Sequence, residues 1–293
     1  MSATTSNDNN DHRPLIKDLI EEHAATIQTV KSDIQEDPLY DAKRYDDIWI
    51  LRFVLSQKTA ARATKAAIST MHYREKNKLN DLGDMRRNFL HPQQDDILMD
   101  IQKKYLYCNP EWSFILCHFN EDKGLVKIVD MHKAGMKEMA AELTKDDILL
   151  NYTYMNEAVY QILDEVTRRT GRLTKICNIL YLGPDFSVRS FSPTYTRLDS
   201  KAAKMMQAFY PQMLGAVLVV DAPSTIGAVW KVMKPLFPKS VAEKFDFIYP
   251  STKEKDVEPL LKYAAKEDLP KFLGGTRENW PPTEQRKTSN AFM

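Results

Sequence analysis

A short strand followed by an almost uniformly apolar helix constrains the fold of this chain more than any other segment. Residues 216–220 (AVLVV) are apolar throughout and show no polar alternation. Such a run is typical of a strand covered on both faces, usually in the centre of a parallel sheet. After Asp221-Ala-Pro, Ser224 is placed to cap a helix that extends to Phe237. The segment therefore predicts a central strand joined to a helix that needs an apolar cover.

The helix expected over residues 224–237 carries apolar side chains on nearly every side. Ala228, Val232 and Leu236 occupy the faces that a surface helix normally leaves polar. Exposing half of the set would cost several kcal/mol, because burying one large apolar side chain contributes about 1.5–3 kcal/mol. The apolar surface of this helix must therefore be covered by protein core, by a bound ligand or by a membrane. The apolar residues at regular helical spacing are Ile226, Val229, Trp230, Met233 and Phe237.

Length, charge and cysteine content narrow the class of protein. The 293 residues suffice for one large or two modest domains. The 41 basic and 40 acidic residues nearly cancel, which argues against a nucleic-acid binder. The chain has an odd number of cysteines, and their spacing does not match a disulfide framework or a zinc site, as expected for reduced thiols. They are Cys108, Cys117 and Cys177. Without a signal peptide or an apolar run of about 20 residues, we expect a soluble, cytoplasmic protein.

Composition divides the chain into four parts. Residues 1–13 are polar and predicted to be disordered, and residues 281–293 are predicted to be a flexible tail. Residues 14–90 are predicted to form a helical subdomain, with helical patterns over 14–35, 45–55 and 59–76. Residues 93–278 are predicted to form the main domain.

The main domain alternates strands with helices. Strands are expected over residues 113–119, 125–129, 175–182, 216–220 and 246–249. A long helix over 144–169 is predicted to begin with a capping box of Thr144 and Asp147 and to end at Gly171. A further helix is expected over 193–209, with closing segments over 258–265 and 269–276. This order predicts an α/β fold with a mostly parallel sheet.

No catalytic motif is present in the sequence. It has no G-x-S-x-G elbow, no phosphate-binding G-x-x-x-x-G-K-[ST] loop and no G-x-G-x-x-G after a strand. The six histidines show no metal-ligand spacing. We therefore predict a protein that is not an enzyme and has no catalytic residues, metal or cofactor. A hydrolase is a distant alternative, for which Ser187 is the one nucleophile to nominate.

Several segments, taken together, resemble the CRAL-TRIO family of lipid-binding and lipid-transfer proteins. Residues 50–55 (ILRFVL) with Lys58 resemble an LRFLRARK-type motif, and Tyr73-Arg74 stands where that family has Trp-Arg. Residues 209–211 (FYP) resemble its YYPE element. Residues 230–237 (WKVMKPLF) resemble its W-x-x-x-K-P-F-L segment, and residues 269–275 (LPKFLGG) its closing motif. The order and spacing of these segments over residues 45–277 make the resemblance specific.

The resemblance implies a helical cap on an α/β domain whose sheet floors a hydrophobic lipid pocket. It further implies that the apolar helix is a movable gate, whereas the residues alone leave a plain core helix open. Two acyl chains hold on the order of 30 methylenes, and exposing them to water costs about 25 kcal/mol. The implied function is a monomeric cytosolic carrier of a phospholipid or isoprenoid-type ligand, with a transient membrane surface as partner. The alternative is a lipid-sensing adaptor without bulk transfer.

The resemblance also implies a headgroup site, but this sequence departs from the family pattern there. The Arg-Lys pair of phosphoinositide-binding members becomes Gln57-Lys58, and the Glu after YYP becomes Gln212. The lysine after the gate is present as Lys244, and Ser187 is a candidate pocket hydroxyl. Replacing arginine removes its two-pronged hydrogen bonding to phosphate. We therefore expect only a weak preference for phosphatidylinositol.

One tight basic cluster comprises Arg168, Arg169, Arg172 and Lys175. At the end of the long helix these cations oppose the helix dipole favourably, which is a structural role. The functional alternative is docking to anionic lipid headgroups, at about 1 kcal/mol per basic residue near a membrane.

Overall fold

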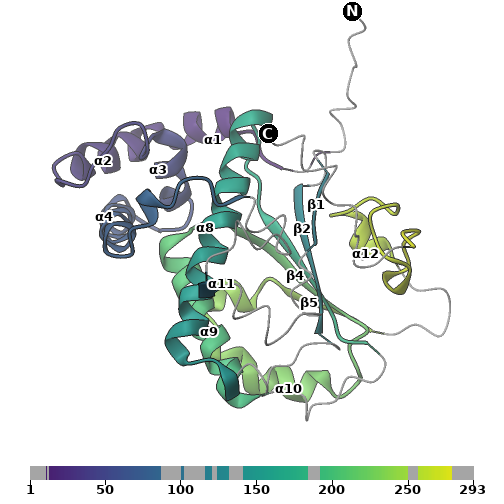
Figure 1. The fold of residues 1–293 in the computed structure, drawn as a ribbon. Helices are drawn as coiled ribbons and strands as arrows, with labels where there is room; N and C mark the ends of the chain where they lie inside the picture. Colours follow the sequence, from purple (N-terminus) through teal and green to yellow (C-terminus); the bar gives the residue numbers. More distant parts are fainter. Residues whose placement is uncertain are drawn as a thin grey trace, which may run out of the picture.

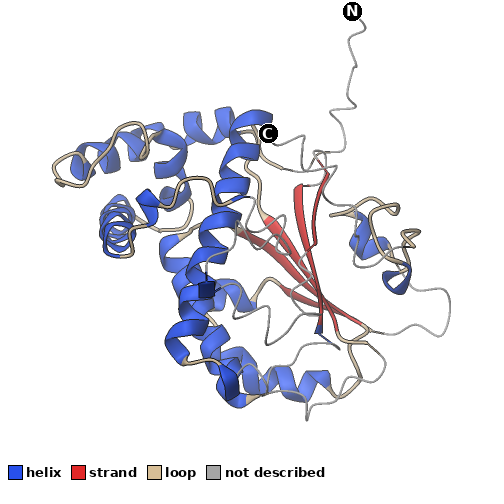
Figure 2. Cartoon of the chain, in the orientation of Figure 1, coloured by secondary structure: helices blue, strands red, loops and turns tan. Residues whose placement is uncertain are grey.

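A central sheet divides the molecule into layers (Figures 1 and 2). The computed structural model describes residues 11, 13–86, 100–101, 116–120, 124–131, 141–183, 192–249 and 257–278. Long helices cover one face of the sheet, a short C-terminal segment covers the other, and the N-terminal helices form a lobe beside the long helices. The predicted tail 281–293 lies outside the described residues, as does the predicted disordered segment 1–13 except for Asp11 and Arg13.

The N-terminal lobe is built from α1 (Ile16–Glu22), α2 (Ala24–Ile34), α3 (Asp47–Val54) and α4 (Ala60–Lys76). Side-chain caps begin two of them. Asp46 accepts from the Trp49 amide at 3.0 Å, and Thr59 accepts from the Arg62 amide at 3.3 Å. The helical pattern over 14–35 is broken at His23, which separates α1 from α2. Ile27, Val30 and Ile34 of α2 are buried in the core of this lobe.

The sheet contains five described strands in sequential order. They are β1 (Leu116–Asn120), β2 (Gly124–Asp130), β3 (Ile176–Tyr181), β4 (Leu214–Val220) and β5 (Phe245–Ile248). The pair β1–β2 is antiparallel, whereas β2–β3, β3–β4 and β4–β5 are parallel. The prediction of an α/β fold with a mostly parallel sheet is therefore confirmed. Residues 113–115 of the expected first strand lie outside the described residues.

Two long helices pack on one face of the sheet, opposite the face covered by the C-terminal segment. Helix α8 (Lys145–Thr170) begins with the predicted capping box of Thr144 and Asp147 and ends at Gly171, whose φ is 66°. Glycine adopts this left-handed conformation without steric cost. Helix α9 (Pro193–Phe209) begins where Ser192 accepts from the Tyr195 amide at 3.2 Å. Both helices are confirmed within one residue of the bounds predicted from sequence.

The apolar helix is shorter than the sequence pattern indicates. Helix α10 (Ile226–Met233) continues into the 3₁₀ turn η6 (Lys234–Leu236), and α11 (Lys239–Ala242) follows. The prediction that Ser224 caps α10 is wrong. The Ile226 amide donates to the backbone carbonyl of Pro223 at 2.8 Å instead, and no side-chain cap precedes the helix.

The second face of the sheet is covered by α12 (Glu258–Leu261) and the 3₁₀ turn η7 (Lys271–Leu273). Leu260, Leu269 and Leu273 pack there against Ile128 and Ile179. The closing Gly274-Gly275 pair has a steric reason, because a Cβ on Gly275 would lie 1.9 Å from the Leu269 carbonyl oxygen. Among the described residues, no helix has the length and hydropathy needed to cross a bilayer.

Candidate functional site

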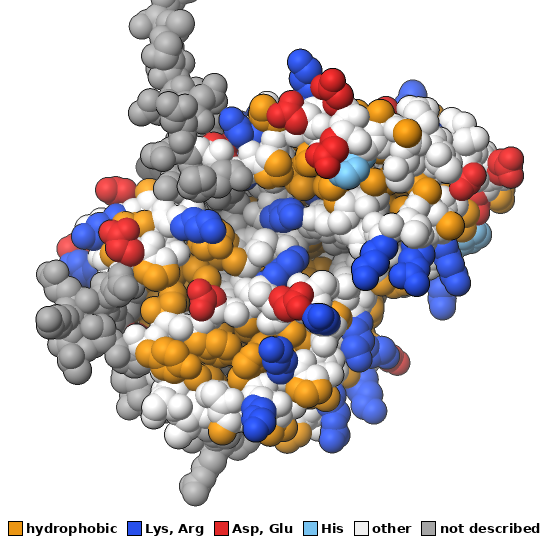
Figure 3. Space-filling view, turned by 180° about the vertical axis from the view of Figure 1, so that it is seen from behind, with side chains coloured by type: hydrophobic (Ala, Val, Ile, Leu, Met, Phe, Trp, Pro, Cys, Tyr) orange, Lys and Arg blue, Asp and Glu red, His pale blue; other side chains and the backbone are white. Residues whose placement is uncertain are grey.

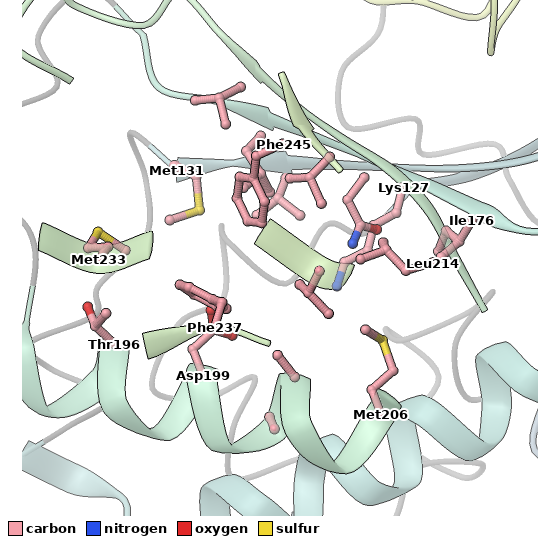
Figure 4. Close-up of a pocket in the computed structure, with 18 of the residues that line it drawn as sticks. Lys127, Met131, Ile176, Thr196, Asp199, Met206, Leu214, Met233, Phe237 and Phe245 are labelled. Carbon is pink, nitrogen blue, oxygen red and sulfur yellow. The ribbon is translucent and has the colours of Figure 1, made fainter. Parts of the chain in front are cut away.

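An apolar cavity of about 230 Å³ lies between the sheet and helices α8, α9 and α10 (Figure 4). Strand alternation supplies its floor. Val217 and Val219 of β4 face the cavity, whereas Leu218 and Val220 pack toward α12 on the other side of the sheet. The opposite wall includes Met155 of α8 together with residues of α9. The strand predicted to be covered on both faces therefore borders a cavity on one face and solid core on the other.

Helix α10 closes one side of this cavity. The Trp230 ring lies 4.4 Å from the ring of Phe245 and 5.5 Å from that of Phe247, measured between ring centroids. These contacts hold α10 against β5. All five residues named from helical spacing line the cavity: Ile226, Val229, Trp230, Met233 and Phe237.

The outer side of α10 is apolar as well. Val232 is 76% exposed and Leu236 is 38% exposed. Lys231, Lys234 and Lys239 are also exposed beside them. In Figure 3, hydrophobic side chains bordered by lysine and arginine gather on the lower half of the molecule, the half that contains α10 in Figure 1. Helix α10 thus presents apolar side chains both to the cavity and to solvent.

A small polar group interrupts the apolar lining. Tyr152 of α8 donates from Oη to Asp199 Oδ1 at 2.8 Å, and its oxygen lies 3.0 Å from Tyr195 Oη. Burial raises the pKa of the Asp199 carboxyl, while the Tyr152 hydrogen bond and the charge of Lys127 oppose that rise. Lys127 of β2 reaches the cavity from the sheet, and its ammonium lies 3.7 Å from Met155 Sδ. An acid and a base therefore face one largely apolar cavity.

Sequence reasoning missed Lys127 and Asp199. A weak signal was present for each. Lys127 is two residues from Val129 on β2, so the two side chains lie on the same face of the strand. Asp199 lies one helical turn from both Tyr195 and Ala202 on α9. In each case a charged residue shares a face with apolar neighbours, but a single sequence does not reveal that the two faces meet.

The headgroup candidates lie in two places at the lobe-side end of the sheet. Gln212, with φ 62°, donates from Nε2 to Ser56 Oγ at 3.0 Å, which places it beside Gln57 and the exposed Lys58. Lys244 donates to the backbone carbonyl of Leu214, two residues beyond Gln212. Ser187 lies outside the described residues.

Lys175 belongs with Lys244 in space. Burial, followed by the charges of Lys244 and Arg52, lowers the pKa of Lys175 to about 8. Burial also lowers the pKa of Lys244. Lys175 is close in sequence to the arginines of α8, but it directly precedes β3 and lies near Lys244.

The arginines at the end of α8 bind carboxylates within the chain. Arg168 binds Asp46 at 2.5 Å and Asp164 at 2.6 Å. The hydrogen bond from Arg168 lowers the pKa of Asp46 against the effect of burial. Arg172 lies 3.3 Å from Asp11 and donates to the Arg13 carbonyl at 2.8 Å. These contacts join α8 to the N-terminal lobe, and Arg169 also has a partner.

A buried polar network joins the lobe to the helices that border the cavity. The Arg74 guanidinium binds both oxygens of Glu157, at 2.8 and 2.9 Å. Tyr210 Oη donates to the same carboxylate at 3.0 Å. The rings of Tyr73 and Phe209 stack beside it, with centroids 3.9 Å apart. The Tyr-Arg and Phe-Tyr-Pro motifs therefore meet as one structural unit.

The described residues include no group of three or more histidine, cysteine, aspartate or glutamate side chains arranged to hold a metal ion. Cys177 is buried under α12, and burial raises the pKa of its thiol to about 12. The side chains of Cys108 and Cys117 lie outside the described residues.

Comparison with known proteins identifies relatives over most of the chain. The family model of the CRAL/TRIO domain matches residues 142–275. The SEC14 cytosolic factor of Eremothecium gossypii is 24% identical, over 88% of this chain and 77% of that protein. The SEC14 cytosolic factor of Kluyveromyces lactis is 25% identical, over 80% and 73%. The crystal structure of Sfh5 has the same fold, with a TM-score of 0.51 at 14% identity over 92% of this chain and 93% of Sfh5.

Proposed function

Because this chain is a member of the CRAL-TRIO family, we propose that it is a lipid-binding and lipid-transfer protein. It encloses one hydrophobic ligand, a phospholipid or an isoprenoid-type molecule, in the cavity beneath α10. It then exchanges this ligand at membrane surfaces. In this proposal the protein is a cytosolic monomer that associates with membranes transiently and performs no catalysis.

The observation that carries the proposal is the two-sided apolar character of α10. Its inner side chains line the cavity, and Val232 is 76% exposed on the outside. An ordinary surface helix has polar side chains on the outside. A helix that alternates between covering a ligand and entering a bilayer needs apolar side chains on both sides. The composition of α10 meets that requirement.

The segments that flank α10 suit a moving element. Asp221, at the start of the connection from β4, has a φ of 55°, and Pro223 follows it. At the other end, Ser200 of α9 donates to the carbonyl of Leu236. Hinges are typically a few residues at element ends that absorb the backbone change. We propose that α10 swings about these two ends and that the Ser200 hydrogen bond helps to hold it shut.

Exposed lysines favour an anionic membrane as the site of opening. Lys231 and Lys234 are exposed on α10 and η6, next to Val232 and Leu236. Each basic residue near an anionic surface contributes about 1 kcal/mol. Insertion of the apolar outer face adds to this attraction. The two contributions together direct opening to membranes.

The headgroup site is proposed at the lobe-side end of β4. Gln57, Lys58 and Gln212 border it on one side, and Lys244 with Lys175 on the other. Lysines supply point charge without the fixed fork of arginine. The proposal keeps the expectation of a weak preference for phosphatidylinositol.

Transfer between vesicles tests the carrier function. Purified full-length protein is added to donor vesicles with labelled lipids and to unlabelled acceptors, and bound lipids are identified by native mass spectrometry. We expect the protein to carry lipid and to accelerate transfer. Protein that is loaded with lipid but never accelerates transfer would instead support the lipid-sensing adaptor.

A further inference from the structure

Two ionisable side chains, Asp199 and Lys127, line a cavity that is otherwise mostly apolar. Asp199 comes from α9 and Lys127 from β2, so the two side chains approach the cavity from opposite walls (Figure 4). Burial raises the pKa of the Asp199 carboxyl, and the positive charge of Lys127 opposes that rise. Placing an ionisable group in apolar surroundings costs several kcal/mol unless partners compensate it. A cavity for hydrocarbon alone is better built without the Asp199 carboxylate.

Asp199 has hydrogen-bonding capacity directed at the cavity. Tyr152 donates to Oδ1 at 2.8 Å, and among the described residues Oδ2 accepts no hydrogen bond. An ionised carboxylate has about four acceptor sites over its two oxygens. The ligand group that best satisfies Oδ2 therefore donates hydrogen bonds, and a cationic donor does so most strongly.

We propose that Asp199 is a specificity-determining residue, which selects a zwitterionic phospholipid with a primary ammonium group, of the phosphatidylethanolamine type. This inference rests on the proposed lipid-carrier function and specifies its ligand. It places the headgroup of a zwitterionic lipid inside the cavity, at a position distinct from the lobe-side site of Gln57, Lys58, Gln212, Lys244 and Lys175. The ammonium N–H groups donate to Asp199, and the phosphate accepts from Lys127. Tyr152 holds the carboxylate in place through its hydrogen bond.

Charge and donor count distinguish this ligand from related lipids. The Asp199 carboxylate calls for a cationic N–H donor, which a primary ammonium headgroup has and a headgroup without an ammonium lacks. Phosphatidylcholine is also a zwitterion, but its quaternary ammonium has no N–H group to donate to Oδ2. Comparing these two lipids with identical acyl chains isolates the hydrogen bond to Asp199.

The test is competitive loading from vesicles that contain equal amounts of phosphatidylethanolamine and phosphatidylcholine with the same acyl chains. Bound lipid is quantified by native mass spectrometry of the full chain. We expect the wild-type protein to carry phosphatidylethanolamine in about tenfold excess. Asp199→Asn, which keeps the shape and removes the charge, reduces this excess, and Asp199→Leu abolishes it. Glu243→Gln removes the same charge from an exposed position and keeps the wild-type ratio.

The outcomes separate the ligand assignment from the carrier function. Equal loading of the two lipids by the wild-type protein, or a preference that survives in both Asp199 variants, would overturn the role of Asp199 and leave the carrier function intact. Both proposals would be overturned if the wild-type protein took up neither of these two lipids and also took up no lipid from a total cellular extract. If Asp199→Leu unfolds, the near-isosteric Asp199→Asn decides the question.

Discussion

Arg74 and Glu157 form a buried ion pair across the boundary between the N-terminal lobe and the main domain, with hydrogen bonds of 2.8 and 2.9 Å. Arg74 is 6% exposed and Glu157 is 1% exposed. Tyr210 donates to the same carboxylate, so the network links α4, α8 and the segment that precedes β4. The lobe and the cavity walls are therefore connected through a pair that is almost entirely buried.

Removing one member of this pair is expected to be strongly destabilising. Arg74→Met leaves the Glu157 carboxylate buried with reduced compensation, and breaking such pairs costs about 3–5 kcal/mol. Urea unfolding followed by circular dichroism measures the loss. The exposed pair Lys239–Glu243, at 3.7 Å, is the control, and Glu243→Gln should cost less than about 1 kcal/mol. Equal costs for the two variants would show that burial does not determine the strength of the Arg74 contact.

Charge on the outer face of α10 is expected to weaken membrane binding without unfolding the protein. Val232 is 76% exposed, so Val232→Asp removes little packing. It does remove an apolar side chain from the proposed inserting face, and we expect vesicle partitioning and transfer to fall about tenfold or more. Trp230→Asp should also lower transfer, with some loss of stability because Trp230 packs on Phe245. Unchanged partitioning of folded Val232→Asp would contradict the proposed opening at membranes.

The hydrogen bond from Ser200 to the Leu236 carbonyl is expected to slow ligand release. Ser200→Ala removes a contact of about 0.5–1.5 kcal/mol, which corresponds to about twofold to tenfold faster release if the bond breaks during opening. Stopped-flow measurement of lipid transfer checks this rate. Thr194→Ala, at an exposed position of the same helix, is the control. A release rate that is the same in both variants would argue against this hydrogen bond as a latch.

Lys175 is expected to make stability depend on pH. Its pKa is lowered to about 8 in the folded state, mainly by burial, against 10.5 for an ordinary lysine. Between these values the unfolded chain binds a proton that the folded chain has released, so stability rises with pH. Lys175→Met should therefore be more stable than wild type at pH 7, and its advantage should shrink toward pH 10.5. Denaturant titrations across this range measure the difference, with exposed Lys204→Met as the control.

The parts of the fold that sequence predicted best are those set by local chemistry. The helix from Lys145 to Thr170 was predicted nearly to the residue, because its capping box and its terminal glycine act within a few positions. The α10 side chains that border the cavity were found for the same reason, since helical spacing alone places them together.

The errors and omissions arise where distant segments meet. Asp199 and Lys127 face one cavity from a helix and a strand that are 72 positions apart, and neither segment shows this by itself. Lys175 is three residues from Arg172 in sequence, yet Arg172 binds Asp11 while Lys175 lies near Lys244. Ser224 is a residue type that often caps helices, but the Ile226 amide donates its hydrogen bond to the backbone carbonyl of Pro223. These outcomes depend on tertiary packing, which a local pattern does not encode.

The two faces of β4 give neighbouring positions different freedom to change. Val217 and Val219 border the cavity, so a substitution at either position changes the shape of the cavity and therefore which ligand fits it. Leu218 and Val220 pack into the permanent core beneath α12, so a substitution there alters whether the protein folds. Cargo selectivity can therefore diverge through alternate residues of a single strand while the intervening residues keep the scaffold constant.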